Sequence, residues 1–398
     1  MDLLNKLNNK LVIKYFIITI FFYYNYNINE NSEHPFYSTS IKPILSNDIT
    51  KKSVLEKGRK YIDKCLKGIR SRKTYKKQNV KISVIIPLFN CQKTIRESII
   101  SIQNQNFNDF ELILINDFSQ DNTSSIIEKF QKDDNRIKII NNNRNMGTLY
   151  SRCIGVLSAS GKYIFSLDND DMYFDEDIFD FIYNKGEKEN LDMIGFQTIN
   201  VWNYTSNIYE MEDIYSYQYP DEYYLSQPEL GRWMVIFKGK YLVHNNMLWD
   251  KCIKSFVYKK AVNLLGIKTY STFIIWAEDT SINFVIFNIA QNFKYIHKYG
   301  IFHFKSKQTA SSIQPMRHKL FAEIFFLNII YRFSKNNEDK NLAVEQGIFI
   351  KTHINLTNFK KSANLIYYKN TLNKIIKNEY ITKFHKRKLI KYLKSYFI

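Results

Sequence analysis

Three carboxylates follow directly after a short hydrophobic run near the middle of the chain. Residues 163–167 form this run, and Asp168, Asp170 and Asp171 come next. Side chains alternate between the two faces of an extended backbone, so Asp168 and Asp170 point the same way if strand geometry continues. Carboxylate oxygens suit Mg²⁺ or Mn²⁺, and such an ion could bind a diphosphate. The alternative is a helix start, because Asp favours the N-cap position.

Alternating strands and helices are expected to place these acids at the rim of a sheet. Four unbroken apolar runs occupy residues 82–88, 110–115, 137–140 and 163–167. Helical spacing separates them at residues 95–102, 126–130 and 146–157. Unbroken apolar strands are typical of a parallel sheet that is covered on both faces. The sequence therefore predicts a doubly wound α/β fold, and such sheets bind ligands at the carboxyl ends of their strands.

The flanks of this region are less regular. Residues 51–78 are strongly basic and have apolar residues near helical spacing, which predicts a helix on the domain or on a membrane. Beyond about residue 200 aromatic residues become dense and the alternation weakens. The patterns there predict helices over 256–265 and 277–289 and a strand over 293–304. Residues 316–398 have the pattern of helices with lysine on one face.

Composition excludes some classes of protein and leaves others open. The chain has 398 residues, of which 45% are hydrophobic, enough for a full core and against global disorder. Its net charge of +19 would suit nucleic acid, anionic membranes or acidic substrates. Lys, Asn, Ile, Tyr and Phe are all abundant, however, so an A/T-rich genome explains the charge as well. No nucleic-acid-binding signature accompanies it, so no specific nucleic-acid binding is expected.

The N-terminus and the cysteines bear on the compartment. Three lysines precede the apolar residues 15–24, a pattern that resembles a signal peptide or a weak signal anchor. This run is shorter than the roughly 20 residues that a spanning helix needs, so a helix packed on the domain is the alternative. We expect a membrane protein of the secretory pathway (ER or Golgi), with a cytoplasmic location as the other possibility. Four widely spaced cysteines argue against a disulfide framework or a zinc site.

Four pieces of sequence, in a fixed order, resemble the nucleotide-sugar half of family-2, GT-A-type glycosyltransferases. They are SVIIPLFN at 83–90, ELILINDFSQDNT at 111–123, the stretch from Asn145 to Ile164, and LDNDD at 167–171. One piece alone is weak evidence, but four in the correct order are specific. The resemblance covers residues 80–200 well and 240–312 more loosely. It implies a GT-A-like, mostly parallel sheet with helices on both faces, followed by a helical C-terminal extension.

The resemblance also implies roles on the donor side. Asp117 would accept a hydrogen bond from the nucleotide base, although the preceding residue is Asn116 where the family commonly has an acid. Asp170 is the expected direct metal ligand, Asp168 would contact ribose or metal, and Asp171 would support them. Further donor-binding candidates are Pro87, Phe89, Asn90, Arg152 and Lys305, and His303 is a further candidate metal ligand. Core packing is the alternative for Pro87, Phe89 and His303, and a surface ion pair is the alternative for Arg152.

On the acceptor side, Trp276–Thr280 resembles the Glu-Asp element of the family at a helix start. Transfer to a hydroxyl needs a base, and Asp279 is the candidate. Glu278 would bind acceptor hydroxyls or hold Asp279 in place. Trp249 could stack on an acceptor sugar, with core packing as its alternative. Acids are also favoured in any first helical turn by the helix dipole, which is the alternative for this pair.

Taken together, the resemblance implies a hexosyltransferase-like enzyme. It would move a sugar from a nucleotide-diphosphate donor, UDP-sugar favoured, to a hydroxyl of a glycan, protein or lipid, with inversion and with Mn²⁺ or Mg²⁺. The alternative is a non-catalytic carbohydrate- or nucleotide-binding protein on the same fold, for which Asn116 and the basic flanks are the motive. The expected segments are 1–24 (signal anchor), 25–79 (stem with basic helical linker), 80–200 (nucleotide-sugar half), 201–315 (acceptor half) and 316–398 (helical extension).

Overall fold

The computed structural model describes residues 49–68, 79–205, 208–211, 222–231, 234–237, 240–243, 247–275, 278–305, 316–335 and 339–340. The chain divides into two compact units, Pro43–His318 and a second unit of Met1–Lys42 with Lys319–Ile398. In the second unit the principal described element is most of helix α11 (Met316–Phe333), which buries Phe325, Ile329 and Ile330. The predicted segment 1–24 and all of 341–398 lie outside the described residues.

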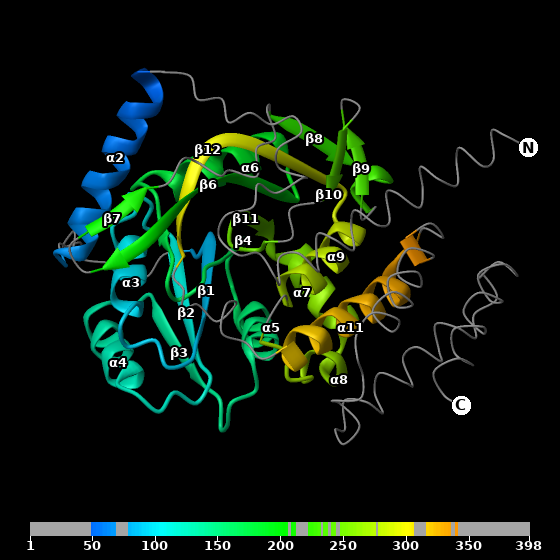
Figure 1. Cartoon of the computed structure of the whole chain (residues 1–398), viewed down its shortest axis with the longest axis horizontal. Coiled ribbons are helices and arrows are strands. Elements are labelled where there is room, and N and C mark those ends of the chain that lie inside the picture. The colour runs from blue at the N-terminus through cyan, green and yellow to red at the C-terminus, as the bar shows by residue number, and fades with distance from the viewer. Residues whose placement is uncertain are drawn as a thin grey trace, which may run out of the picture. The chain divides into compact units, whose positions relative to one another are not determined.

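A ten-stranded sheet forms the centre of the larger unit (Figure 1). One half is parallel and has the order β3-β2-β1-β4. Its strands are β1 (Ile82–Leu88), β2 (Phe110–Asn116), β3 (Ile137–Asn141) and β4 (Tyr163–Ser166). Every residue of β1, β2 and β4 is buried, as expected for strands covered on both faces.

The other half of the sheet is mixed. β11 runs antiparallel to both β4 and β6, β12 runs parallel to β6, and β5 pairs antiparallel with β12. β7 pairs with β6, and β8 pairs with β12. These strands are β5 (Met172–Tyr173), β6 (Met193–Thr205), β7 (Ile208–Met211), β8 (Tyr223–Ser226), β11 (Lys251–Lys254) and β12 (Asn292–Lys305). A separate hairpin joins β9 (Met234–Phe237) and β10 (Lys240–Val243).

Helices cover both faces of the sheet (Figure 1). One group consists of α3 (Ile95–Gln103) and α4 (Thr123–Asp133), with α6 (Ile178–Glu189) packed against β6. The other group consists of α5 (Thr148–Ser158), α7 (Ser255–Leu265), α8 (Ile267–Tyr270) and α9 (Glu278–Ile289), with the short helix η1 (Glu229–Gly231) beside α9. The predicted doubly wound, GT-A-like fold is confirmed by this arrangement.

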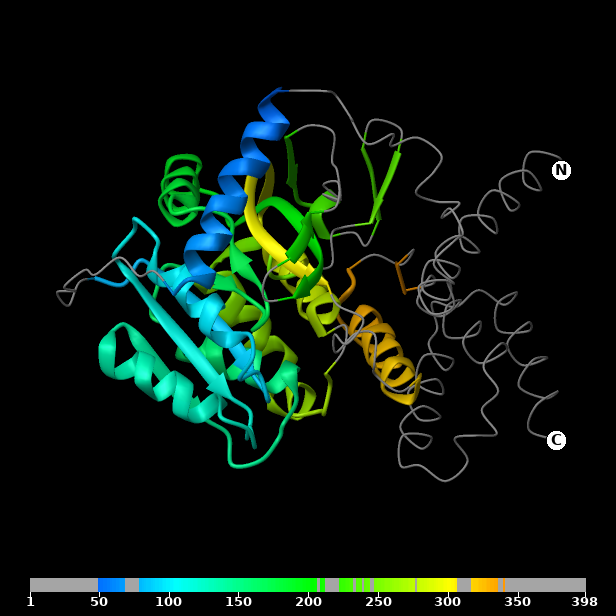
Figure 2. The ribbon, with the colours of Figure 1, turned by 60° about the vertical axis from the view of Figure 1, so that its left-hand side comes forward.

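Helix α2 (Ile49–Leu66) belongs to the segment that was predicted to be a stem and linker. It lies along α3 (Figure 2), and its residues Ile62 and Cys65 are fully buried in the core. The Tyr61 hydroxyl donates to the backbone oxygen of Ser101 at 2.9 Å, and Lys57 pairs with Asp175 at 3.3 Å. This basic helix is therefore packed on the domain, one of the two positions expected for it.

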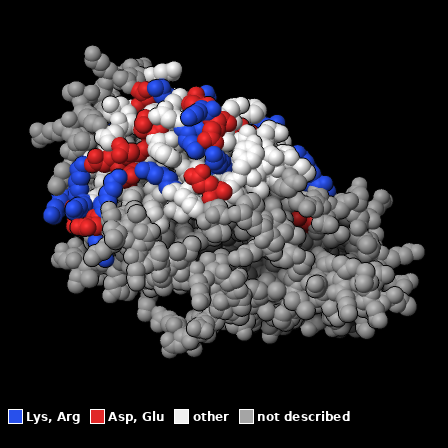
Figure 3. All heavy atoms as spheres, turned by 90° about the horizontal axis from the view of Figure 1, so that it is seen from above, with Lys and Arg blue, Asp and Glu red and all other residues white. Residues whose placement is uncertain are grey.

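Two surface properties complete the description. Among the described residues, no helix has both the length and the apolar character needed to cross a membrane. The secretory-pathway location, which rested on residues 1–24, stays a prediction. On the face seen from above in Figure 3, basic and acidic side chains of the described residues are interspersed. Over the described part of that face, interspersed charges of this kind produce no large field of one sign.

Helix α5 approaches the sheet closely because residue 155 is glycine. A Cβ atom at Gly155 would lie 2.5 Å from Cγ2 of Ile85 and 2.7 Å from Cδ1 of Ile115. We predict that Gly155→Val lowers the free energy of unfolding by about 1–3 kcal/mol through overpacking. Urea denaturation measures the change, with Ser158→Val at the exposed end of α5 as the control. Unchanged stability of Gly155→Val would contradict the close packing.

Candidate functional site

Asp117 lies where β2 ends, and it is buried. Its carboxylate accepts hydrogen bonds from Asn142 Nδ2 at 2.7 Å and from the backbone N–H groups of Met146 and Gly147, both at 2.8 Å. Asp117 therefore ties the loop before α5 to the rim of the sheet. A carboxylate has about four lone-pair positions, so these three donors leave capacity for one more. The contact with a nucleotide base stays a prediction.

The amide of Asn116 has its own internal partners. Its Nδ2 donates to Ser124 Oγ at 2.9 Å and to Asn141 Oδ1 at 3.0 Å, while its Oδ1 accepts from the N–H of Ser119 at 3.0 Å. An ionised carboxylate cannot donate a hydrogen bond to Asn141. The hydrogen bonds of Asn116 therefore explain why an amide and not a carboxylate stands at this position, which the sequence alone did not show.

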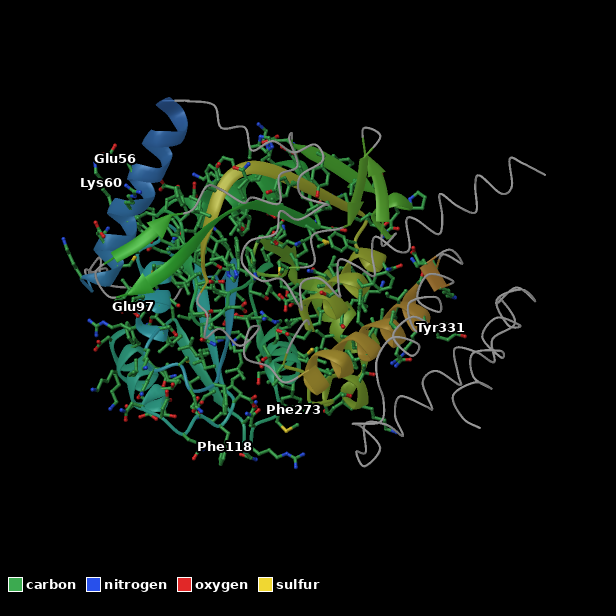
Figure 4. All side chains as sticks on the ribbon, in the orientation of Figure 1. Glu56, Lys60, Glu97, Phe118, Phe273 and Tyr331 are labelled. Atoms are coloured by element: carbon green, nitrogen blue, oxygen red, sulfur yellow. The ribbon has the colours of Figure 1, made fainter. Side chains whose placement is uncertain are left out.

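Exposed aromatic rings flank this part of the rim. Phe89 after β1 and Phe118 after β2 are each nearly half exposed. Phe118 has a positive φ of 66°, which is strained for a bulky residue, and such strain clusters at functional sites. Phe273, also exposed, lies at the same end of the molecule as Phe118 (Figure 4). The sequence prediction missed Phe118 and Phe273, although Phe118 directly follows the predicted base-binding acid.

Asn90 and Pro87, the two other residues predicted at this rim, each make a hydrogen bond between a side chain and the backbone. Asn90 has a positive φ of 49°, and its Oδ1 accepts from the N–H of Gln120 at 2.8 Å. The carbonyl of Pro87 accepts from Asn169 Nδ2 at 3.2 Å. These contacts connect the loops after β1, β2 and β4. The predicted contact of Pro87 and Asn90 with a sugar nucleotide stays a prediction.

The acids after β4 form a tight turn, in which the N–H of Asp171 donates to the carbonyl of Asp168 at 3.2 Å. Burial raises the pKa of Asp168 to about 6, against the lowering effect of Arg152. Burial and the charges of Asp171 and Asp168 raise the pKa of Asp170 to about 7, and His303 lowers it in part. The turn therefore brings three carboxylates together, of which Asp171 is buried and Asp168 and Asp170 are partly exposed.

Asp171 is fully buried and faces β12. It accepts from the N–H of Phe304 at 3.0 Å, and His303 Nδ1 lies 3.0 Å from its Oδ2. The His303 ring stacks on Trp249, with centroids 4.7 Å apart and planes 13° apart. Asp171 and Trp249 thus fix the orientation of His303, as outer partners orient a metal-binding histidine. Trp249 is only 4% exposed, and its predicted contact with an acceptor stays a prediction.

Arg152, on α5, is buried among three carboxylates. Its Nη2 lies 3.0 Å from Asp168 Oδ1, 3.0 Å from Glu278 Oε1 and 4.0 Å from Asp279 Oδ1. Burial lowers the pKa of Arg152, but the three acids outweigh burial and hold it well above its usual value. Among the described residues, the buried Nε and Nη1 have no hydrogen-bond partner. The surface ion pair considered for Arg152 is therefore not what the structure shows.

The acceptor-side acids begin α9. Burial and the charge of Asp279 raise the pKa of Glu278 to about 8, against the effect of Arg152. Asp279 Oδ2 accepts from the N–H of Leu248 at 3.4 Å. Nearby, the buried Lys251 donates to Asp250 Oδ1 at 2.7 Å and to the carbonyl of Met247. The sequence prediction missed Lys251, although a lysine beside an aspartate at the start of an otherwise apolar segment was visible.

The donor set can be tested for its fit to a metal ion. In the described parts of the chain, no group of three His, Cys, Asp or Glu side chains is arranged to hold one. Mg²⁺ usually needs only one or two carboxylates, because substrate phosphates and water complete its shell. Asp168 and Asp170 fit such a site. Lys305 ends β12 in register with Trp202, and its side chain, like Trp276, lies outside the described structure.

Comparison with known proteins adds to this geometry. Residues 83–240 match the family described as glycosyl transferase family 2. A Campylobacter jejuni GalNAc(5)-diNAcBac-PP-undecaprenol beta-1,3-glucosyltransferase is 45% identical over 92 residues, 23% of this chain and 30% of the relative. A Borreliella burgdorferi cholesterol galactosyltransferase is 36% identical over 114 residues, 29% of this chain and 31% of the relative. The chain thus matches less than a third of the length of these relatives.

Solved structures support the fold. S. aureus TarS 1–349 in complex with UDP-GlcNAc has a TM-score of 0.52 and 15% identity, over 77% of this chain and 83% of TarS 1–349. The complex with UDP has a TM-score of 0.51 over 79% of this chain and 87% of that one. The family match runs from β1 to the first residue of β10 and includes Asp117 and the acids after β4, whereas Glu278, Asp279 and β12 lie beyond it. Residues 83–240 are the part of the chain that is similar to glycosyl transferase family 2.

Proposed function

We propose that the protein is a glycosyltransferase that moves a sugar, with inversion, from a UDP-sugar to an acceptor hydroxyl. The observation that carries this proposal is the contact of one buried arginine, Arg152, with acids of both halves of the site. Asp168 follows β4, Glu278 begins α9, and Arg152 lies 3.0 Å from each. The acids predicted for the donor and for the acceptor therefore belong to one site.

The arrangement suits a single displacement. Asp279 would take the proton of the acceptor hydroxyl as that oxygen attacks the anomeric carbon. The diphosphate leaves from the opposite side, which inverts the configuration at this carbon. The N–H of Leu248 donates to Asp279 Oδ2, and Arg152 Nη2, which also contacts Asp168, lies 4.0 Å from Asp279 Oδ1. Glu278, anchored by Arg152, is placed to hold Asp279 or to bind acceptor hydroxyls.

A divalent cation, Mn²⁺ or Mg²⁺, fits the acid turn. Asp170 and Asp168 would hold it, with His303 oriented toward the turn by Asp171. When bound, such an ion neutralises charge on the leaving diphosphate. The positive charge of Arg152, whose Nη2 lies 3.0 Å from Asp168 Oδ1, would add to this neutralisation.

Donor and acceptor class are supported by the named relatives. UDP and UDP-GlcNAc are bound in the TarS structures, which favours a UDP-sugar donor here. The two named relatives transfer glucose and galactose, which favours a hexose. Their names also give an undecaprenol-linked and a cholesterol acceptor, so we propose a lipid-linked hydroxyl. Asn116 and the basic flanks were the two reasons for a non-catalytic alternative, and the internal hydrogen bonds of Asn116 give that residue a structural explanation instead.

Removal of the proposed base is the first test. We predict that Asp279→Asn reduces sugar transfer about 10²–10⁴-fold while UDP affinity stays the same, because the amide keeps the shape and lacks basicity. Nucleotide release from UDP-sugars measures transfer, and calorimetry measures UDP binding. Asp180→Asn, which removes the first-turn acid of α6, is the matched control. Wild-type turnover in Asp279→Asn would remove Asp279 from the reaction.

Removal of the proposed metal ligand is the second test. We predict that Asp170→Asn weakens Mn²⁺-dependent UDP binding at least about tenfold, the loss typical of even an outer partner of a metal site. Calorimetry with UDP, with Mn²⁺ and with a chelator, measures the difference. In chelator, the variant and the wild type should bind UDP equally weakly. Equal UDP affinity with and without Mn²⁺ in the wild type would refute the metal site.

Removal of the central cation is the third test. We predict that Arg152→Met lowers the free energy of unfolding by about 3–5 kcal/mol, because it leaves buried carboxylates without their cation. Adding Glu278→Gln should recover part of this loss, which urea denaturation of both variants measures. Arg136→Met removes a buried arginine paired with Asp134 and is the control, expected to destabilise without changing transfer per folded molecule. If the changes in the free energy of unfolding caused by Arg152→Met and Glu278→Gln simply add in the double variant, the two side chains are not coupled and the prediction is wrong.

A further inference from the structure

The outer face of α7 and α8 exposes bulky apolar side chains. The inner face of α7 is buried through Val257, Tyr258, Ala261, Val262 and Leu265. On the outer side, Phe256 is 70% exposed and Ile267 is 64% exposed, the two highest values for bulky apolar residues in the described structure. Leu264 is exposed on the same side and lines a shallow hollow with Phe256. Water contact of such groups is unfavourable, so this face has the character of a contact surface.

The same face is basic. Helices α7 and α8 contribute three lysines, Lys259, Lys260 and Lys268, and neither helix contains an Asp or Glu. Lys260 Nζ lies 5.7 Å above the Phe256 ring, and Lys268 is exposed on α8. Lys259 lines the hollow with Lys260 and donates to the carbonyl of Ala159 at 2.6 Å. This face differs from that of Figure 3, where both signs of charge are interspersed.

We propose that the α7–α8 face docks on an anionic lipid surface. Phe256, Leu264 and Ile267 would enter the boundary between headgroups and acyl chains, and Lys260 and Lys268 would contact anionic headgroups. Apolar burial and lysine–headgroup attraction are two independent contributions, and stable membrane binding by a peripheral protein usually needs two. This surface is separate from residues 1–24 and goes beyond the proposed sugar transfer.

Charge complementarity argues against the other occupants. Residues 341–398 contain twelve Lys and Arg and two Glu, so this segment carries the same sign as the face. A second copy of the chain would bring a net charge of +19 to it. Like charges in contact are disfavoured. Phospholipids with net negative charge supply both an opposite charge and an apolar interior.

The face is connected to the candidate site. The buried Tyr258 of α7 lies 3.4 Å, hydroxyl to hydroxyl, from Ser166 at the end of β4. After α8, the carbonyl of Ile274 accepts from the N–H of Leu149 at 3.1 Å, beside Gly147 and its bond to Asp117. The exposed Phe273 of the same loop lies at the lower end of the view in Figure 4. A membrane on α7–α8 would therefore lie next to the rim of the sheet.

A fluorescent probe on this face tests the proposal in the full chain. Ile267→Cys can be labelled selectively with an environment-sensitive fluorophore, because the four native cysteines are buried. Phe181→Cys on α6 is the matched control, since Phe181 is also exposed and has a lysine, Lys298, 5.4 Å above its ring. With vesicles of phosphatidylcholine and phosphatidylglycerol, emission at 267 should rise and shift to the blue, whereas emission at 181 should not change. Pure phosphatidylcholine should give a smaller response.

Charge reversal tests the lysines. Lys260→Glu/Lys268→Glu should lower partitioning into the anionic vesicles about tenfold or more, since each lysine near such a surface contributes about fivefold. Lys129→Glu/Lys132→Glu makes the same change of net charge on the exposed side of α4 and should have a much smaller effect. Equal losses in the two double variants would show that only net charge matters and would overturn the docking face.

Three outcomes of the probe experiment would also overturn the proposal. An unshifted probe at 267, in protein that sediments with vesicles, would place the membrane contact elsewhere. A blue shift without vesicles at every protein concentration would show that another segment of the chain covers the face. A blue shift that grows with protein concentration without vesicles would identify a second copy as the occupant. Each result is independent of sugar transfer, so it leaves the proposed activity to its own tests.

Discussion

The site depends on one buried cation among several buried acids. Arg152 contacts Asp168 and Glu278 at 3.0 Å, and these residues come from distant parts of the chain. Carboxylates taken out of water repel one another and lose hydration, so they gather only where a cation and donors compensate them. Guanidinium suits this position better than ammonium, because it stays charged and its planar fork reaches several oxygens. Without it, the acid turn and the start of α9 would repel each other.

The position of Arg152 follows from the packing of α5. Gly155 lets this helix lie directly on β1 and β2, and Arg152 is three residues earlier, on the adjacent turn. The start of α5 is fixed by Asp117, which binds the backbone N–H groups of Met146 and Gly147. The residue predicted to bind the nucleotide base therefore also positions the helix that carries the central cation. Donor-side geometry and acceptor-side geometry are mechanically linked through α5.

The sequence predicted the parallel half of the sheet well, because buried parallel strands are unbroken apolar runs that a local pattern shows. The acid turn and Asp279 were visible for the same reason, since each lies at the boundary of one element. The partners of Arg152 were not visible: Glu278 is 126 residues away, and no local period encodes such a pair. β12 was predicted as a strand over 293–304, but its long partner β6 was missed because the polar and aromatic residues of β6 obscure the strand pattern. Lys251 was missed because a buried lysine is explained only by its partners.

The division of roles among the acids also follows from their partners. Asp168 gives one oxygen to Arg152, so it serves first as the link between α5 and the acid turn. Asp171 is occupied by His303 and by the N–H of Phe304, so it holds β12 against the same turn. Asp170 lies between these two, and their charges together with burial raise its pKa to about 7. A divalent cation gains most where negative charge is least compensated, and this makes Asp170 the principal residue that would hold a metal, with Asp168 as the second.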